Sequence, residues 1–485
     1  MDNPQSFGPV LRRLRIDAGL THEALAEQAG LGARTISDLE RGVSRAPRPD
    51  TLALLVAALR LSPEQRELLE TSARQPTTPA LDQAASRTSR NRLPLQLTTF
   101  VGRERQTAAV RQLLLRNDIR LVTLTGPGGV GKTRLSLHLA AELIASFDGV
   151  FVIDLAPLSD PTAVGNAIGH ALDMGSASPV SSTQLIETIG QRPCLLLLDN
   201  FEHLLDAVPL VVELLRHCPL LNVLVTSRAA LHISGEQEYP VPPLPVPDRN
   251  GSLTIEQLTA YESIQLFVDR ASLMRPEFSL TESNVADIAG ICARLEGLPL
   301  ALELAAARIK SFPPHVLLRQ LQRSTGAPSL QLLEGGPRDV HARHQTLRDT
   351  IGWSYNLLSQ TDQALFRRLS VFKGGCTREQ AGTVCGPLDV ERGLDVLIDH
   401  SLLYLSEGGG EEPRIHMLET IAEFALEQLN AAGETAEYQR CHARYFLELV
   451  ESTGALLFAP ESKRARTAAE QGNLSAALSW LVLHG

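Results

Sequence analysis

The chain has 485 residues, 44% of them hydrophobic, and a net charge of −10, which is enough apolar material for several packed domains. The acidic balance excludes a polycation that coats nucleic acid along its whole length, so any nucleic-acid contact has to come from a local basic patch. Because the chain has no Cys-x-x-Cys spacing, no signal-peptide pattern and no apolar run near the ~20 residues of a membrane span, we expect a cytoplasmic protein without a membrane partner.

Residues 1–75 have the pattern of five short helices. Thr21 is placed to cap the second helix, and Gly42 to end the third. Two helices joined by a Gly-containing turn, with the second helix polar on one face, indicate a helix-turn-helix. The segment resembles the repressor-like XRE family through Leu20-Thr21, Ala24-Leu25-Ala26, Ala29-Gly30-Leu31, Ile36-Ser37 and Leu39-Glu40-Arg41-Gly42. The resemblance implies a domain that binds double-stranded DNA.

In that family the third helix enters the major groove by its N-terminal half. We therefore expect base contacts from Arg34, Thr35 and Ser37, with Asp38 as a weaker candidate. The candidates for phosphate contacts are Arg12, Arg13, Arg41 and Arg45. Seven arginines against six acidic residues up to residue 48 give a modest attraction, so two copies on a paired site would be needed. The alternative for this segment is a helical bundle that binds protein.

Residues 76–95 are polar and lack an apolar period, which indicates a flexible linker. The segment 96–248 that follows alternates apolar, β-branched runs with helical spacing, as in an α/β domain. The runs that we expect to be buried strands are 120–125, 150–155, 193–199 and 221–228.

A phosphate-binding loop is predicted between the first of these strands and a helix that begins near Arg134. Its residues are Gly126, Pro127, Gly128, Gly129, Val130, Gly131, Lys132 and Thr133. Arg134, directly after the loop, is a further candidate for contact with the nucleotide. Lys132 is the first of only four lysines, in a chain with 41 arginines among its 45 basic residues. We expect Lys132 to reach the terminal phosphates and the Thr133 hydroxyl to bind magnesium.

Two polar residues end later strands at the same predicted edge of the sheet. Asp199 follows an apolar strand, as the Walker B carboxylate that holds magnesium does, and the alternative is a turn-forming residue. Arg228 ends the strand 221–228 and is a candidate to sense the γ-phosphate, against the alternative of a surface salt bridge.

The motifs of residues 96–430, taken in order, resemble the NB-ARC class of STAND ATPases. They are Phe100-Val-Gly-Arg-Glu104, the loop 126–133, Leu195-Leu-Leu-Leu-Asp-Asn200, Val225-Thr-Ser-Arg228 and Gly297-Leu-Pro-Leu-Ala-Leu302. The resemblance implies a multidomain fold with a parallel-sheet P-loop domain, a helical domain (249–335), a winged helix (336–432) and the start of a TPR-like helical array (433–485). It also implies ATP or ADP and magnesium as ligands.

The resemblance places further roles on single residues. Val101 and Gly102 would hold adenine, with Arg103 nearby, Pro299 would pack on the nucleotide, and His416 would lie over the ADP phosphates. Two departures from the family pattern stand at Met417, where the family has an acid, and at Asn200, which cannot accept a proton from water. Glu202 is a substitute base, or else an ordinary acid at a helix N-terminus.

We expect a transcriptional regulator that is switched by ATP and ADP and reset by slow hydrolysis. An inducer or protein acting on the C-terminal part would shift the balance between the two states. The ATP-bound chain would self-associate and pair its DNA-binding domains. The acidic stretch 408–412 favours an internal role for the winged helix. The rivals are an oligomerising defence or signalling ATPase with an N-terminal adaptor, a steadily turning-over ATPase and a constitutive repressor.

Overall fold

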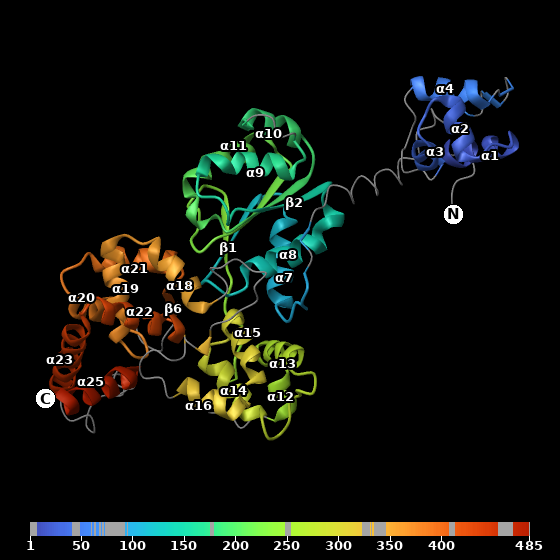
Figure 1. Cartoon of the computed structure of the whole chain (residues 1–485). Coiled ribbons are helices and arrows are strands. Elements are labelled where there is room, and N and C mark those ends of the chain that lie inside the picture. Colours follow the sequence, from blue (N-terminus) through green and yellow to red (C-terminus); the bar gives the residue numbers. More distant parts are fainter. Residues whose placement is uncertain are drawn as a thin grey trace. The chain divides into compact units, whose positions relative to one another are not determined.

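The computed structural model describes residues 7–40, 49–59, 93–94, 96–174, 179–247, 254–322, 346–406, 413–453 and 469–484, with a few single positions between them. The chain divides into two compact units, residues 1–89 and residues 90–485 (Figure 1). Within the described ranges, no helix combines the length and apolar character that crossing a membrane requires.

The first unit contains the helices α1 (Phe7–Asp17), α2 (His22–Ala29), α3 (Ala33–Glu40) and α4 (Pro49–Leu59). Helix α2 begins after Thr21, whose Oγ1 accepts the N–H of Ala24 at 3.1 Å, and it ends at Gly30, which has a φ of 64°. These features confirm the predicted cap and the Gly-containing turn of the helix-turn-helix. The core is made of fully buried residues on each helix: Leu11, Leu25, Ile36 and Leu55. Gly42 and residues 76–92 and 95 of the predicted linker lie outside the described residues.

The second unit is built on a parallel sheet with the strand order β2-β3-β4-β1-β5. Its strands are β1 (Leu121–Thr125), β2 (Gly149–Asp154), β3 (Cys194–Asp199), β4 (Leu221–Thr226) and β5 (Glu236–Pro240). The first four confirm the strands expected from apolar runs. Strand β5 was not predicted, because its residues are mostly polar. Among the described strands it pairs with β1 alone, at the edge of the sheet. An edge strand can have one face in solvent, and it tolerates Pro240, which has no N–H to donate.

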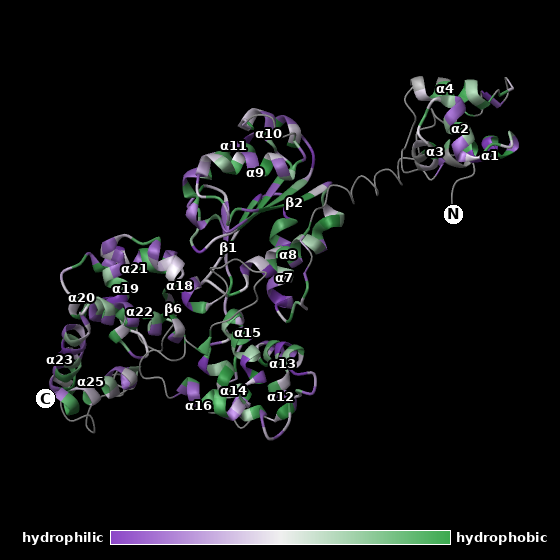
Figure 2. Cartoon of the chain, viewed as in Figure 1, coloured by the Kyte–Doolittle hydropathy of each residue, from purple (hydrophilic) through white to green (hydrophobic). Residues whose placement is uncertain are grey.

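Both faces of the sheet are covered by helices, so the strand residues are buried in alternation. Leu195 and Leu197 of β3 pack with α7 (Glu104–Leu114) and α8 (Lys132–Leu143). Leu196 and Leu198 pack in a separate core with α9 (Val164–Ala171), α10 (Ser182–Ile189) and α11 (Val208–His217). Hydrophobic residues accordingly lie along the central strands (Figure 2). This burial fixes the strand ends on which the predicted site depends.

The remaining elements are mostly helical, as expected. A helical segment contains α12 (Ile255–Thr259), α13 (Glu262–Met274), α14 (Val285–Arg294), α15 (Pro299–Ala307) and α16 (Pro314–Gln322). A winged-helix segment follows, with α18 (Leu347–Asn356), α19 (Gln360–Arg368), α20 (Arg378–Val384), α21 (Val390–Asp399), the antiparallel pair β6 (Tyr404–Ser406) and β7 (Arg414–His416), and α22 (Glu419–Ala431). Helices α23 (Thr435–Thr453) and α25 (Gln471–His484) complete the chain. The inner domain boundaries stay predictions, and the acidic stretch 408–412 lies outside the described residues.

Candidate functional site

The predicted phosphate-binding loop connects β1 to α8, and its backbone depends on glycine. Gly126, Gly129 and Gly131 have φ values of 141°, 80° and 95°, which side chains other than glycine rarely adopt. The Nζ atom of Lys132 donates to the carbonyl oxygens of Gly126 at 2.6 Å and Pro127 at 3.2 Å. Burial lowers the pKa of Lys132 to about 8. The lysine is thus held inside the loop, where it can exchange carbonyl partners for phosphate oxygens.

A hydroxyl and a carboxylate that could hold magnesium meet beside the loop. Thr133 Oγ1 donates to Asp199 Oδ1 at 2.8 Å, and Thr226 Oγ1 donates to the same oxygen at 2.5 Å. Burial raises the pKa of Asp199 to about 6. These oxygen ligands suit magnesium, which takes few protein ligands when phosphates supply the others. Among the described residues, no group of three or more His, Cys, Asp or Glu side chains would hold a metal by itself.

Arg228 and Glu202, which the sequence singled out separately, form a buried pair. Arg228 Nε donates to Glu202 Oε1 at 3.1 Å, and the two side chains are 2% and 4% exposed. Arg228 Nη1 also donates to the carbonyl oxygen of Thr350 at 2.9 Å, in helix α18. Arg228 is therefore no surface residue, and it links the P-loop domain to the winged-helix segment.

The two arginines predicted near the nucleotide have different surroundings. Arg103, which is 3% exposed, donates from Nη2 to the carbonyl oxygens of Val130 at 2.5 Å and Pro242 at 3.0 Å. Burial lowers its pKa to about 10. Arg134 instead donates to Thr98 Oγ1 at 2.7 Å, so it holds the segment before Val101 against α8.

Helix α15 begins directly against the loop, as the predicted role of Pro299 requires. The N–H of Leu300 donates to the carbonyl oxygen of Gly129 at 3.1 Å, and Pro299 Cγ lies 3.9 Å from the position of a β-carbon on Gly131. The turn before this helix needs glycine, because Gly297 has a φ of 68° and a β-carbon there would lie 1.9 Å from the carbonyl oxygen of Leu244. The role of Pro299 toward a nucleotide stays a prediction.

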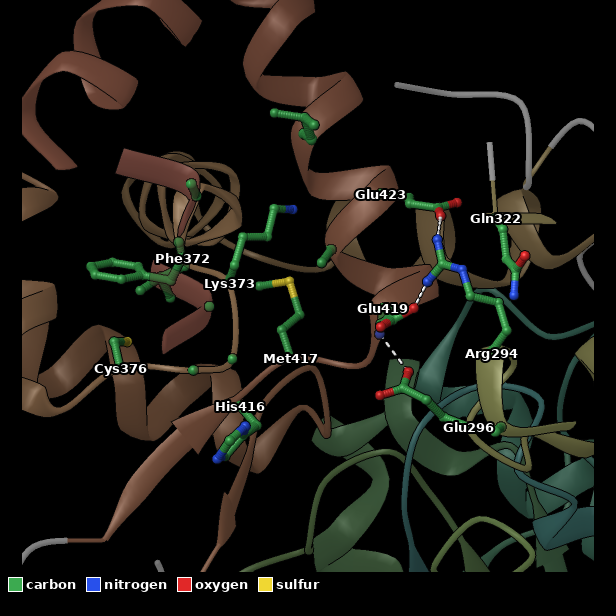
Figure 3. A pocket seen from close by; sticks show the side chains of 18 of the residues that line it. Arg294, Glu296, Gln322, Phe372, Lys373, Cys376, His416, Met417, Glu419 and Glu423 are labelled. Carbon is green, nitrogen blue, oxygen red and sulfur yellow. Dashed lines mark hydrogen bonds and ion pairs between the residues drawn. The ribbon is translucent and has the colours of Figure 1, made fainter. Parts of the chain in front are cut away.

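His416 lies in β7, stacked on Tyr404 with ring centroids 5.4 Å apart. It lines a cavity of about 1420 Å³ between α14, the winged-helix segment and α25 (Figure 3). On another side of this cavity, Arg294 pairs with Glu419 and Glu423 and so ties α14 to α22. The described contacts of His416 thus belong to this cavity, and its predicted role over the phosphates stays a prediction.

Three winged-helix residues near the P-loop were not predicted. Besides Thr350, they are Ser401, whose Oγ donates to the carbonyl oxygen of Arg228 at 2.5 Å, and the adjacent His400. The Nδ1 atom of His400 is buried without a hydrogen-bond partner among the described residues, and burial lowers the pKa of this histidine. No local pattern marks these residues, because their proximity to the loop arises only from packing.

The predicted DNA contacts are partly visible in the first unit. Arg12 and Arg13 on α1 and Thr35 on α3 are exposed, whereas Ser37 is half-buried. The side chains of Arg34 and Asp38, and all of Arg41 and Arg45, lie outside the described residues. The assignment of these residues to DNA stays a prediction.

Two protein families match separate parts of this chain. A helix-turn-helix domain family matches residues 6–69, and a winged helix-turn-helix domain family matches residues 358–430. A protein of Mycobacterium tuberculosis named as an HTH-type transcriptional regulator is 39% identical over 380 residues, 76% of this chain and 40% of that protein. The regulatory protein AfsR of Streptomyces coelicolor is 26% identical over 471 residues, 92% of this chain and 43% of AfsR. The chain thus spans about 40% of the length of these relatives.

Two solved structures show a weaker likeness. A STAND protein with a tetratricopeptide repeat sensor from Pyrococcus horikoshii has a TM-score of 0.32 and 16% identity, covering 73% of this chain and 46% of that one. The Walker-type ATPase of Pyrococcus abyssi has a TM-score of 0.42 and 12% identity, covering 69% and 99%. Both likenesses are too distant to inform function.

One relative is matched over most of its own length. An uncharacterized protein of Mycobacterium tuberculosis is 36% identical over 347 residues, which are 70% of this chain and 83% of that protein. Identity of this extent places the two chains in one family. The chain therefore belongs to the family of this mycobacterial protein. Along this chain, a helix-turn-helix domain, a parallel sheet with a glycine-rich loop and a winged helix follow one another.

Proposed function

We propose that this chain is a DNA-binding transcriptional regulator whose P-loop unit holds ATP or ADP with magnesium. The two helix-turn-helix matches and the relatives named as regulators support the DNA-binding part. The glycine-dependent loop, Lys132 and the Thr133–Asp199 contact support the nucleotide-binding part. The finer proposal is that the bound nucleotide decides whether the winged helix stays on the P-loop domain.

The position of Arg228 carries this proposal. Its guanidinium is bound to Glu202 and to the carbonyl oxygen of Thr350, and its own carbonyl oxygen accepts a hydrogen bond from Ser401. A β-carbon on Gly128 would lie 2.4 Å from Thr350 Cγ2 and 3.4 Å from Arg228 Cζ, so α18 packs directly on the phosphate-binding loop. In this proposal, a third phosphate draws the Arg228 guanidinium toward the loop and away from the carbonyl oxygen of Thr350. Binding of a third phosphate and docking of α18 therefore compete for one side chain.

The residues of the loop would act in a defined order. A bound nucleotide supplies phosphate oxygens, and magnesium neutralises part of their charge. Lys132 would leave the carbonyl oxygens of Gly126 and Pro127 for the phosphates, while Thr133 and Asp199 would hold magnesium. With ADP, Arg228 would keep Thr350. With ATP, Arg228 would turn to the third phosphate, and α18 would lose its charged partner.

Hydrolysis would be slow and would serve as a reset. Asn200 donates from Nδ2 to Asp199 Oδ2 at 2.9 Å, and its amide cannot take a proton from water. Glu202 can do so, but Arg228 holds one of its oxygens. The ion pair with Arg228 would make Glu202 a weaker base, and the loss of that pair would strengthen it.

The test is the DNA affinity of the full chain as a function of nucleotide. A duplex is first selected from random sequence, and its dissociation constant is then measured with ADP or with ATP and magnesium. We expect the ATP form to bind about 10-fold more tightly, Lys132→Ala to abolish this difference, and Lys310→Ala, at an exposed lysine, to retain it. Equal affinity in both forms would indicate a constitutive binder, and failure to select any duplex would favour an adaptor role for the first unit.

A further inference from the structure

Two side chains of opposite charge lie beside Gly102 without forming an ion pair. Among the described residues, Arg103 Nη1 and Glu262 Oε2 are both buried and neither has a hydrogen-bond partner. Glu262 is nevertheless close enough to raise the pKa of Arg103 against the larger lowering effect of burial. Buried polar atoms are almost always hydrogen-bonded, and an unmatched charged one is costly. These two atoms are therefore available to a polar group of a ligand.

The pair lies next to the phosphate-binding loop. Arg103 Nη2 donates to the carbonyl oxygen of Val130, and it lies 3.9 Å from the position of a β-carbon on Gly131. Glu262 is the first residue of α13, and its carboxylate reaches the turn at Gly102. The loop and the N-terminus of α8 are the places for phosphates. The rest of a nucleotide would thus extend toward Arg103 and Glu262.

Gly102 contributes to the same arrangement. Its φ is 70°, and a β-carbon there would lie 2.7 Å from Glu262 Oε2 and 2.6 Å from Glu262 Cδ. A side chain at residue 102 would push the carboxylate away from the turn. The absence of a side chain therefore lets Glu262 approach the backbone that precedes Arg103.

We propose that Glu262 and Arg103 bind the nucleoside part of the nucleotide. Glu262 Oε2 accepts a hydrogen bond from an N–H or O–H group of the base or ribose, and Arg103 Nη1 donates to a neighbouring acceptor. This role rests on the proposed function, because it assumes that the loop binds nucleotide. It adds a carboxylate from the helical segment to the site, whereas the motifs of the sequence supplied only backbone groups and Arg103.

The experiment separates the nucleoside from the phosphates. The full chain with magnesium is titrated with ADP and with inorganic tripolyphosphate in a calorimeter. We expect Glu262→Ala to weaken ADP binding about 10- to 100-fold and to leave tripolyphosphate binding unchanged, since a hydrogen bond to a charged group is lost. Glu256→Ala, at an exposed residue of the neighbouring helix α12, should change neither affinity. Lys132→Ala should weaken both.

Two nucleotide analogues distinguish the donors. If Glu262 binds the exocyclic amine of adenine, the wild type prefers ADP to inosine diphosphate and Glu262→Ala loses this preference. If Glu262 binds the ribose, the lost preference is that for ADP over 2′-deoxy-ADP. Unchanged ADP affinity in Glu262→Ala would overturn the proposal, and so would a parallel loss of ADP and tripolyphosphate binding. A wild type that binds neither ligand would contradict the proposed function itself.

Discussion

Replacement of Arg228 by methionine should destabilise the contact between the P-loop domain and the winged helix. The variant loses the hydrogen bond to Glu202 Oε1 at 3.1 Å and the one to the Thr350 carbonyl at 2.9 Å. It also leaves the Glu202 carboxylate, which is 4% exposed, without this charged partner. Removing one partner of a buried ion pair costs about 3–5 kcal/mol of unfolding free energy. Glu202→Gln removes the stranded charge, so the double variant should lose about 2 kcal/mol less than the sum of the single losses.

Tryptophan fluorescence offers a local readout for this double-mutant cycle. Trp353 lies in α18 with its ring edge-on to His203 at 5.7 Å, and Trp480 is the other tryptophan of the chain. Urea unfolding is therefore followed in a Trp480→Phe background, in which the signal reports on α18. If the double variant loses as much unfolding free energy as the two single variants together, to within about 0.5 kcal/mol, the coupling between Arg228 and Glu202 is refuted.

Three further predictions concern ionisation and backbone shape. Because burial raises the pKa of Asp199 to about 6, magnesium-dependent ADP affinity measured by calorimetry should fall as the pH drops through about 6, and a flat profile would contradict this. Without ligand, Asp199 binds its proton more tightly in the folded chain than in the unfolded chain. Its contribution to the free energy of unfolding is therefore present at low pH and is lost as the pH rises from 3.8 to about 6. Burial lowers the pKa of His442 to about 4, so as the pH falls the unfolded chain is protonated at this residue before the folded chain is. The free energy of unfolding should therefore fall by up to about 3 kcal/mol as the pH drops from 6.5 toward 4. His442→Gln should flatten that dependence, and an unaltered slope would exclude His442 as its source. Gly297→Ala and Gly433→Ala both place a β-carbon at positive φ, which should cost about 1–2 kcal/mol of unfolding free energy in each case. Of these two β-carbons, the one at residue 297 would also lie 1.9 Å from a carbonyl oxygen. Chemical denaturation should show roughly 2 kcal/mol more loss for Gly297→Ala, and equal losses would count against the packing described for that turn.

The P-loop and its strands could be predicted because their signals are local. Eight consecutive residues carry the loop chemistry, and the buried strands are short apolar runs on either side of it. The close contact of Thr133 with Asp199 followed from the rule that parallel strands present polar groups at one edge. The helix-turn-helix was equally accessible, since caps such as Thr21 and Gly30 act within one turn of the chain.

Contacts between distant segments could not be predicted from the sequence in this way. Thr350 reads as one position in an amphipathic helix, and only packing brings its carbonyl oxygen to Arg228. Glu262 begins a helix more than 150 residues after Gly102, so no spacing relates the two. The family resemblance places His416 over the phosphates, whereas its described contacts are with Tyr404 and the cavity beside α25.

The central claim is that the nucleotide decides whether α18 stays docked on the P-loop. Hydrogen exchange of the α18 amides, followed by mass spectrometry on the full chain, tests it most directly. With ADP, we predict slow exchange over Leu347–Asn356, and with a non-hydrolysable ATP analogue, faster exchange there but not in β3. Lys132→Ala should abolish the difference. Equal exchange of α18 with both nucleotides, each shown to be bound, would contradict the account.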